Sequence, residues 1–93
     1  MGHAPDKPKH LAEKLRTIRE GLNLSQSQMI GRLRCDLTNA RISEYETGVR
    51  IPSLLTLLAY GRVARVRVEV LIDDRLELPE RLRTAETIAC PDA

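Results

Sequence analysis

The stretch NARISEYETG, residues 39–48, places an amide at Asn39 and a guanidinium at Arg41. An amide donates and accepts hydrogen bonds at once, and a guanidinium donates two in parallel. Both groups therefore suit two-pronged pairing with the edges of purine bases. Ile42 and Tyr45 lie three residues apart in the same stretch, which is the spacing of a buried stripe on a short helix. The pattern predicts a helix held to the body by its apolar side, with its polar side turned to a partner.

Two helices are predicted before this stretch. Residues 9–21 carry leucine and isoleucine at spacings of four, three and four, which is typical of an amphipathic helix. Residues 25–34 begin with Ser25 as N-cap and Gln28 three residues later, as in a capping box. Gly31 inside this second helix costs about 1 kcal/mol relative to alanine. We therefore expect Gly31 to permit a close approach of another helix.

Two further helices are predicted from capping residues. One covers residues 39–46, with Thr38 as N-cap and Gly48 in the left-handed position that follows the last turn. Another covers residues 53–64, with Pro52 in its first turn. The expected core positions of the four helices are Leu11, Leu15, Ile18, Leu22, Met29, Ile30, Leu33, Ile42, Tyr45, Leu54, Leu57, Leu58 and Val63.

The segment 65–72 permits two interpretations. Arginine or glutamate alternates with valine over residues 65–70, which favours a strand. The two apolar residues that follow break the alternation and favour a short helix starting near Val68. Asp73 and Asp74 are expected to end the segment.

The length of 93 residues allows one small domain with short tails. We expect a flexible N-terminal arm at residues 1–9, a folded domain at 10–74 and a C-terminal extension at 75–93, loosely held beyond Pro79. Because the chain contains no Trp and no Phe, the core must be aliphatic. A core of this size gives modest stability, so a second copy of the chain would add useful buried area.

The net charge of +2 is too balanced to identify a partner by itself. Residues 1–50 hold nine Lys and Arg against six Asp and Glu, so the basic excess lies in the half that contains the opening stretch. Basic charge gathered on one face attracts phosphates, although a solvated surface of mixed sign accounts equally well for the count.

Cofactors, metals and catalysis are not expected. Cys35 and Cys90 lie far apart, without a Cys/His cluster of metal-binding spacing. There is no glycine-rich phosphate loop, nucleophile elbow or pair of carboxylates framed by apolar residues, so we do not expect an enzyme. No apolar run approaches the length of a membrane span. These features predict a cytoplasmic protein with free thiols.

Residues 11–74, taken in order, resemble the phage-repressor/Cro type of helix-turn-helix regulators, the XRE family. The resemblance depends on L-x-x-x-R at residues 15–19, LSQ at 24–26 and IS-x-Y-E-x-G at 42–48, followed by Pro52 and an apolar helix. It implies an all-α, five-helix bundle like the lambda-repressor DNA-binding domain. It also implies a transcription regulator, such as a repressor, that binds operator DNA, usually as a dimer.

The resemblance also implies site residues, carried over by matching position. Gln26 and Arg50 would contact the DNA backbone. Thr38, Asn39, Ala40 and Arg41 would face bases, with Ser43 and Glu44 at the margin of the site.

Other interpretations of single residues stay open. Arg41 could instead pair with Glu44 three residues on, and Arg50 could be a free surface charge. Glu46 is expected to be structural, bonding either Arg19 or a backbone amide near the end of the first helix. Two positions depart from the family pattern. The turn has about two extra residues among 34–37, and Ile30 stands where a small residue is usual.

Two functions from different classes follow. The first is a homodimeric regulator on a pseudo-palindromic double-stranded operator. The second is an antitoxin-like module in which residues 65–93 bind a protein partner and DNA binding is secondary. An RNA-binding protein is a weaker third. The expected dimer surface is Val66, Val68, Val70, Leu76 and Leu78.

Overall fold

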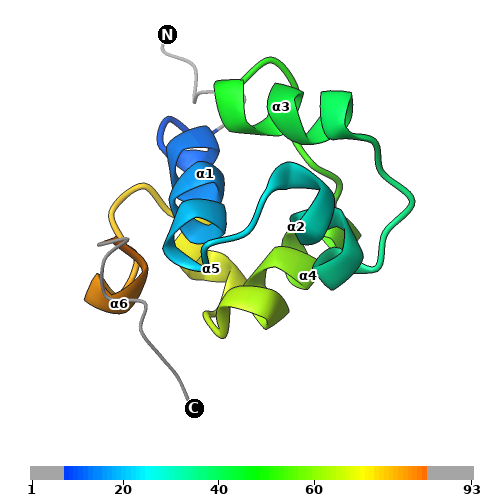
Figure 1. Cartoon of the computed structure of the whole chain (residues 1–93). Helices are drawn as coiled ribbons and strands as arrows, with labels where there is room; N and C mark the ends of the chain where they lie inside the picture. Colours follow the sequence, from blue (N-terminus) through cyan, green and yellow to red (C-terminus); the bar gives the residue numbers. More distant parts are fainter. Residues whose placement is uncertain (1–7, 84–93) are drawn as a thin grey trace, which may run out of the picture.

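The computed structural model of the chain describes residues 8–83. This part of the chain is all-helical, without a strand (Figure 1). The predicted all-α class is confirmed, with a sixth short helix beyond the five that were expected. The helices are α1 (Leu11–Gly21), α2 (Gln26–Leu33), α3 (Asn39–Thr47), α4 (Leu54–Ala64), α5 (Val68–Ile72) and α6 (Glu80–Arg83).

One core joins all six helices and is aliphatic except for two tyrosines. The prediction that Leu54 and Leu58 are core residues is wrong, since both are exposed. Helix α4 instead turns Leu57, Tyr60 and Ala64 inward. The core residues are Leu11, Leu15, Ile18, Met29, Leu33, Ile42, Tyr45, Leu57, Tyr60, Ala64, Leu71, Leu78 and Leu82. Leu22, Ile30 and Val63 are partly buried against them.

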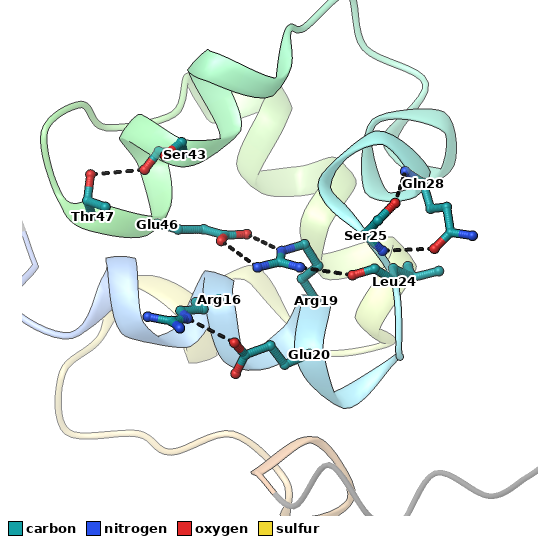
Figure 2. A network of polar contacts seen from close by, with 9 residues as sticks. All are labelled: Arg16, Arg19, Glu20, Leu24, Ser25, Gln28, Ser43, Glu46 and Thr47. Atoms are coloured by element: carbon teal, nitrogen blue, oxygen red, sulfur yellow. Dashed lines mark hydrogen bonds and ion pairs between the residues drawn. The ribbon is translucent and has the colours of Figure 1, made fainter.

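The predicted capping box of α2 is confirmed. Ser25 Oγ accepts a hydrogen bond from the Gln28 backbone N–H at 3.1 Å, and Gln28 Oε1 accepts one from the Ser25 N–H at 2.8 Å (Figure 2). Two backbone donors that a helix start leaves without intrahelical partners are thereby satisfied. The pair therefore fixes where α2 begins.

Close backbone approaches occur at two glycines that the sequence did not single out, at Gly21 to helix α6 and at Gly61 to the link that follows α4. A Cβ on Gly21 would lie 2.9 Å from the Leu82 carbonyl oxygen, and one on Gly61 would lie 2.9 Å from that of Val66. Gly31 is exposed, and a Cβ there would meet nothing within 4 Å. The prediction of a close approach at Gly31 is therefore wrong.

The start of α4 differs from the prediction by one residue. Ser53 is the N-cap, and its Oγ accepts a hydrogen bond from the Thr56 N–H at 3.2 Å. Pro52 precedes the cap instead of lying in the first turn, and it is buried. Its fixed φ thus shapes the link between α3 and α4 rather than the helix itself.

Residues 68–72 form helix α5, so the strand interpretation is wrong. The buried Lys14 of α1 explains how this short helix is held. Lys14 Nζ donates to the carbonyl oxygens of Val70 at 2.7 Å and Asp73 at 3.0 Å. These carbonyls at the end of α5 have no partner within the helix, and that of Asp73 also accepts from the Leu76 N–H at 3.0 Å. The lysine therefore satisfies them and ties α5 to α1.

The carboxylate of Asp74 fixes the start of α1. Asp74 accepts hydrogen bonds from the backbone N–H groups of Lys9 at 2.8 Å and His10 at 3.0 Å. These bonds lower the pKa of Asp74, because they favour its charged form. Residues 1–7 of the predicted arm lie outside the described residues. Within the described part, no helix has the length and apolarity needed to cross a membrane.

Helix α6 packs on the domain, against the expectation of a loosely held tail beyond Pro79. Leu78 and Leu82 are both buried in the core. Arg81 donates to the carbonyl oxygen of Ala64 at 3.0 Å, at the C-terminal end of α4. The chain after α5 thus closes over α1 and the end of α4. Residues 84–93 lie outside the described residues.

Candidate nucleic-acid interface

Helix α3 begins at Asn39 as predicted and ends at Thr47, one residue later than predicted. Thr38 Oγ1 accepts a hydrogen bond from the Arg41 N–H at 3.1 Å, which caps the first turn. Gly48 is left-handed, with φ of 84°, and its N–H bonds to the Glu44 carbonyl oxygen. A side chain disfavours this conformation, so glycine allows the chain to reverse there. The helix is therefore short and bounded by local chemistry at both ends.

The N-terminal side of α3 is turned to solvent. Ile42, Tyr45 and Glu46 are buried. Helix α3 lies at one edge of the molecule, next to α1 and α2 (Figure 1). The predicted contact residues Thr38, Asn39, Ala40, Arg41, Ser43 and Arg50 are all exposed, whereas Gln26 and Glu44 are half-buried.

An ion pair holds α3 against α1. Arg19 Nε donates to Glu46 Oε2 at 2.7 Å, and a terminal guanidinium nitrogen donates to Oε1 at 3.0 Å (Figure 2). The other terminal nitrogen donates to the Leu24 carbonyl oxygen at 3.0 Å. Hydrogen bonding to Glu46 raises the pKa of Arg19. The structural role expected for Glu46 is confirmed, and Arg19 joins α1, α3 and the segment before α2.

A hydroxyl in α2 orients the amide that opens α3. Ser27 Oγ lies 3.2 Å from Asn39 Oδ1 and donates to it. The sequence analysis missed Ser27, although its place in the first turn of α2, beside Gln26, could have indicated it. The amide oxygen keeps a second lone pair and the amide nitrogen keeps its donors. Asn39 is thus held in place while its remaining hydrogen-bonding capacity faces outward.

Glu44 forms ion pairs with both arginines that are predicted to contact DNA. Its Oε1 atom lies 3.2 Å from Arg41 Nε and 2.9 Å from Arg50 Nε. Arg41 therefore forms the ion pair with Glu44 that helical spacing allows, and Arg50 is paired with the same carboxylate rather than free. Such exposed pairs contribute only about 0–1 kcal/mol. Both guanidiniums can accordingly exchange the carboxylate for a phosphate or a base at little cost.

The connection between α2 and α3 is longer than the four-residue turn of the family pattern. It covers the five residues 34–38, one more than four, where the sequence predicted about two extra residues. Arg34 takes a left-handed conformation with φ of 57° and ends α2. Cys35 and Leu37 are partly buried against the core. The longer turn is therefore anchored, and it sets α3 at a fixed place beside α2.

Two capped helices joined by a short turn, the second with its polar side exposed, define a helix-turn-helix protein. A family model described as helix-turn-helix matches residues 15–71, more than half of the chain. The chain therefore belongs to this family, in its phage-repressor/Cro (XRE) type, and is a DNA-binding regulator. A search of curated proteins and a search of solved structures each found no match.

Proposed function

We propose that this protein regulates transcription by inserting α3 into the major groove of a specific double-stranded operator. The observation that carries the proposal is the two-sided character of α3. Its inner side is fixed by Ile42, Tyr45 and the Arg19–Glu46 pair, while its N-terminal polar residues are exposed. In helix-turn-helix proteins it is the N-terminal residues of this second helix that reach base edges.

The roles of the site residues follow from their chemistry. Asn39 would pair with adenine and Arg41 with guanine, each contributing about 1–3 kcal/mol of discrimination. Thr38 and Ala40 would lie against neighbouring base edges, with Ser43 and Glu44 at the margin. Backbone phosphates would be contacted by Gln26, Arg50 and the N-terminus of α4 near Ser53.

We propose a homodimer on a pseudo-palindrome whose half-sites lie about 10–10.5 base pairs apart, or a multiple of this. The net charge of +2 supports the dimer, because a single chain brings little net positive charge to the phosphates. A repressor would act by occupying such a site. No cofactor enters this mechanism.

The antitoxin-like alternative receives less support. It requires the segment from residue 65 onward to await a protein partner. Leu78 and Leu82 are instead buried in the protein's own core, and Arg81 bonds to the end of α4. A partner site in the C-terminal extension would have to lie outside these residues.

Selection of bound sequences from random duplex DNA tests the proposal. We expect enrichment of a two-fold symmetric site. The logarithm of affinity should fall with the logarithm of salt concentration by about 0.9 per phosphate contacted. Absence of any enriched sequence, with affinity equal for all duplexes, would refute sequence-specific regulation.

Arg41 and Arg50 should have separable effects. We expect Arg41→Ala to weaken discrimination at one or two base pairs by about 1–3 kcal/mol. We expect Arg50→Ala to weaken binding to all sequences alike and to reduce the salt slope by about one contact. Fluorescence anisotropy on the selected site, on single-base variants of it and on random duplex measures both effects.

Glu44→Gln is the matched control for these two substitutions. It removes the carboxylate charge that holds both guanidiniums but keeps the arginines themselves. We expect tighter binding to every duplex. Identical losses for Arg41→Ala and Arg50→Ala on every DNA would contradict the division between base and phosphate contacts.

A further inference from the structure

Five large apolar side chains lie exposed in the link after α3 and on the first turns of α4. Leu54 is 81% exposed, Leu55 76% and Leu58 39%, while Val49 and Ile51 are 71% and 43% exposed. We call these five residues the α4 apolar surface. Large apolar side chains gathered on a soluble protein mark an interaction site more often than single exposed leucines do.

Helical geometry gathers the three leucines on one side of α4. Leu54 and Leu58 are four residues apart and Leu55 and Leu58 three, so they are neighbours on the helix. The core side of the same helix is occupied by Leu57 and Tyr60. The exposed leucines therefore cannot turn inward without lifting the core residues of α4 out.

The size of the surface suits one side of a stable dimer. If a fully exposed aliphatic residue presents roughly 150–200 Å², the five exposed fractions amount to about 450–600 Å², in the upper part of the range for the largest apolar patch of a monomer. Two such surfaces would bury about 900–1,200 Å² in total, and the upper figure reaches the lower end of specific protein–protein interfaces.

The charge of the surface suits contact with its own copy. Residues 49–58 contain a single charged side chain, Arg50, and this guanidinium already faces Glu44 at 2.9 Å. In a two-fold symmetric interface the same patch meets itself, so a charged patch would oppose like charges. An apolar surface avoids that repulsion, whereas a partner of opposite charge would find little here to recognise.

We propose that the α4 apolar surface is where a second copy of this chain docks. The inference rests on the proposed function, because an operator with two half-sites calls for a homodimer. Residues 48–53 join α3 directly to α4. In each copy, therefore, only these six residues separate the recognition helix α3 from the helix that would lie beside the two-fold axis.

This surface replaces the one expected from the sequence. Leu78 of that expected surface is buried in the core, so its assignment to a dimer contact is wrong. Val66, Val68 and Val70 are partly buried and pack against the core. Leu76 is the one member of that set that is exposed, at 40%.

Sedimentation equilibrium of the full chain without DNA tests the proposal, from micromolar to near-millimolar concentration. We expect the wild-type mass to rise to that of two chains, and Leu55→Lys to weaken dimerisation at least tenfold. Leu76→Lys is the matched control, an exposed leucine outside the surface, and should dimerise like wild type. Circular dichroism establishes that each variant is folded, and Leu54→Lys replaces Leu55→Lys if the latter unfolds.

Wild-type chain that stays monomeric throughout would overturn the proposal, and another occupant would then cover the surface. Loss of dimerisation in Leu76→Lys but not in Leu55→Lys would overturn it equally. Binding to DNA separates this inference from the proposed function. A dimer that enriches no DNA sequence refutes the regulator but leaves the docking surface standing. Binding to a half-site by a chain that never dimerises would refute the docking surface but leave the DNA-binding regulator standing.

Discussion

Replacing Glu46 with alanine should lower the free energy of unfolding by about 3 kcal/mol. The Glu46 side chain is 5% exposed and that of Arg19 is 17% exposed. Removing the carboxylate leaves a largely buried guanidinium without its partner, and such a loss costs about 3–5 kcal/mol. We take the lower figure because Arg19 keeps its bond to the Leu24 carbonyl. For a domain of this size the melting temperature should fall by more than about 10 °C.

Urea denaturation followed by circular dichroism measures this loss, and the chain offers a matched control. Arg16 and Glu20 also form an ion pair on α1, at 2.9 Å, with both side chains about half exposed (Figure 2). Glu20→Ala should therefore change stability by less than about 1 kcal/mol. If the two alanine variants lost similar small amounts, the Arg19–Glu46 pair would not hold α3 as we argue.

The same substitution should also affect recognition. Glu46 and Tyr45 lie on the inner side of α3, and the ion pair joins that side to α1. Without it, the exposed amide and guanidinium at the start of α3 would be presented from a less rigid helix. We therefore expect Glu46→Ala to lose sequence discrimination even under conditions in which it stays folded.

Helix ends could be predicted from the sequence because their chemistry is local. The capping box joins Ser25 and Gln28, and Thr38 and Ser53 each accept from a backbone N–H three residues on. Gly48 marks the end of α3 by its left-handed conformation. All of these signals lie within four residues of the feature they determine.

The buried side of α4 could not be predicted in the same way. Its sequence, LLTLLAYGRVA, is apolar at most positions, so periodicity does not select one side. The side is selected by packing on the rest of the domain, where Leu57, Tyr60 and Ala64 join the core. The three exposed leucines of α4, Leu54, Leu55 and Leu58, are the consequence, and they form part of the proposed docking surface.

The candidate site was partly predictable. A pair between Arg41 and Glu44 follows from helical spacing. The bonds from Ser27 to Asn39 and from Arg50 to Glu44 do not, because each crosses a turn whose path the residue types do not determine. The bond from Lys14 to the Val70 carbonyl joins residues 56 apart in the chain, so the sequence does not show it, and the alternation over residues 65–70 alone resembled a strand.

Replacing Leu82 with alanine should lower the free energy of unfolding by about 2–4 kcal/mol. Leu82 is 2% exposed, and truncating a buried leucine removes its transfer free energy and leaves a cavity. Its backbone also lies against Gly21, so α6 fits closely onto α1. We expect the substitution to loosen α6 first, with faster amide exchange at the end of α1 than in α3.

Leu76→Ala is the control, because Leu76 is 40% exposed and should cost less than about 1 kcal/mol. Equal losses for the two variants would mean that α6 only rests on the surface. The expected difference would instead place residues 78–82 within the folding unit, although the family match ends at residue 71. The core of this protein would then need a C-terminal segment that the helix-turn-helix pattern does not contain. That segment is α6, whose backbone packs against α1 at Gly21.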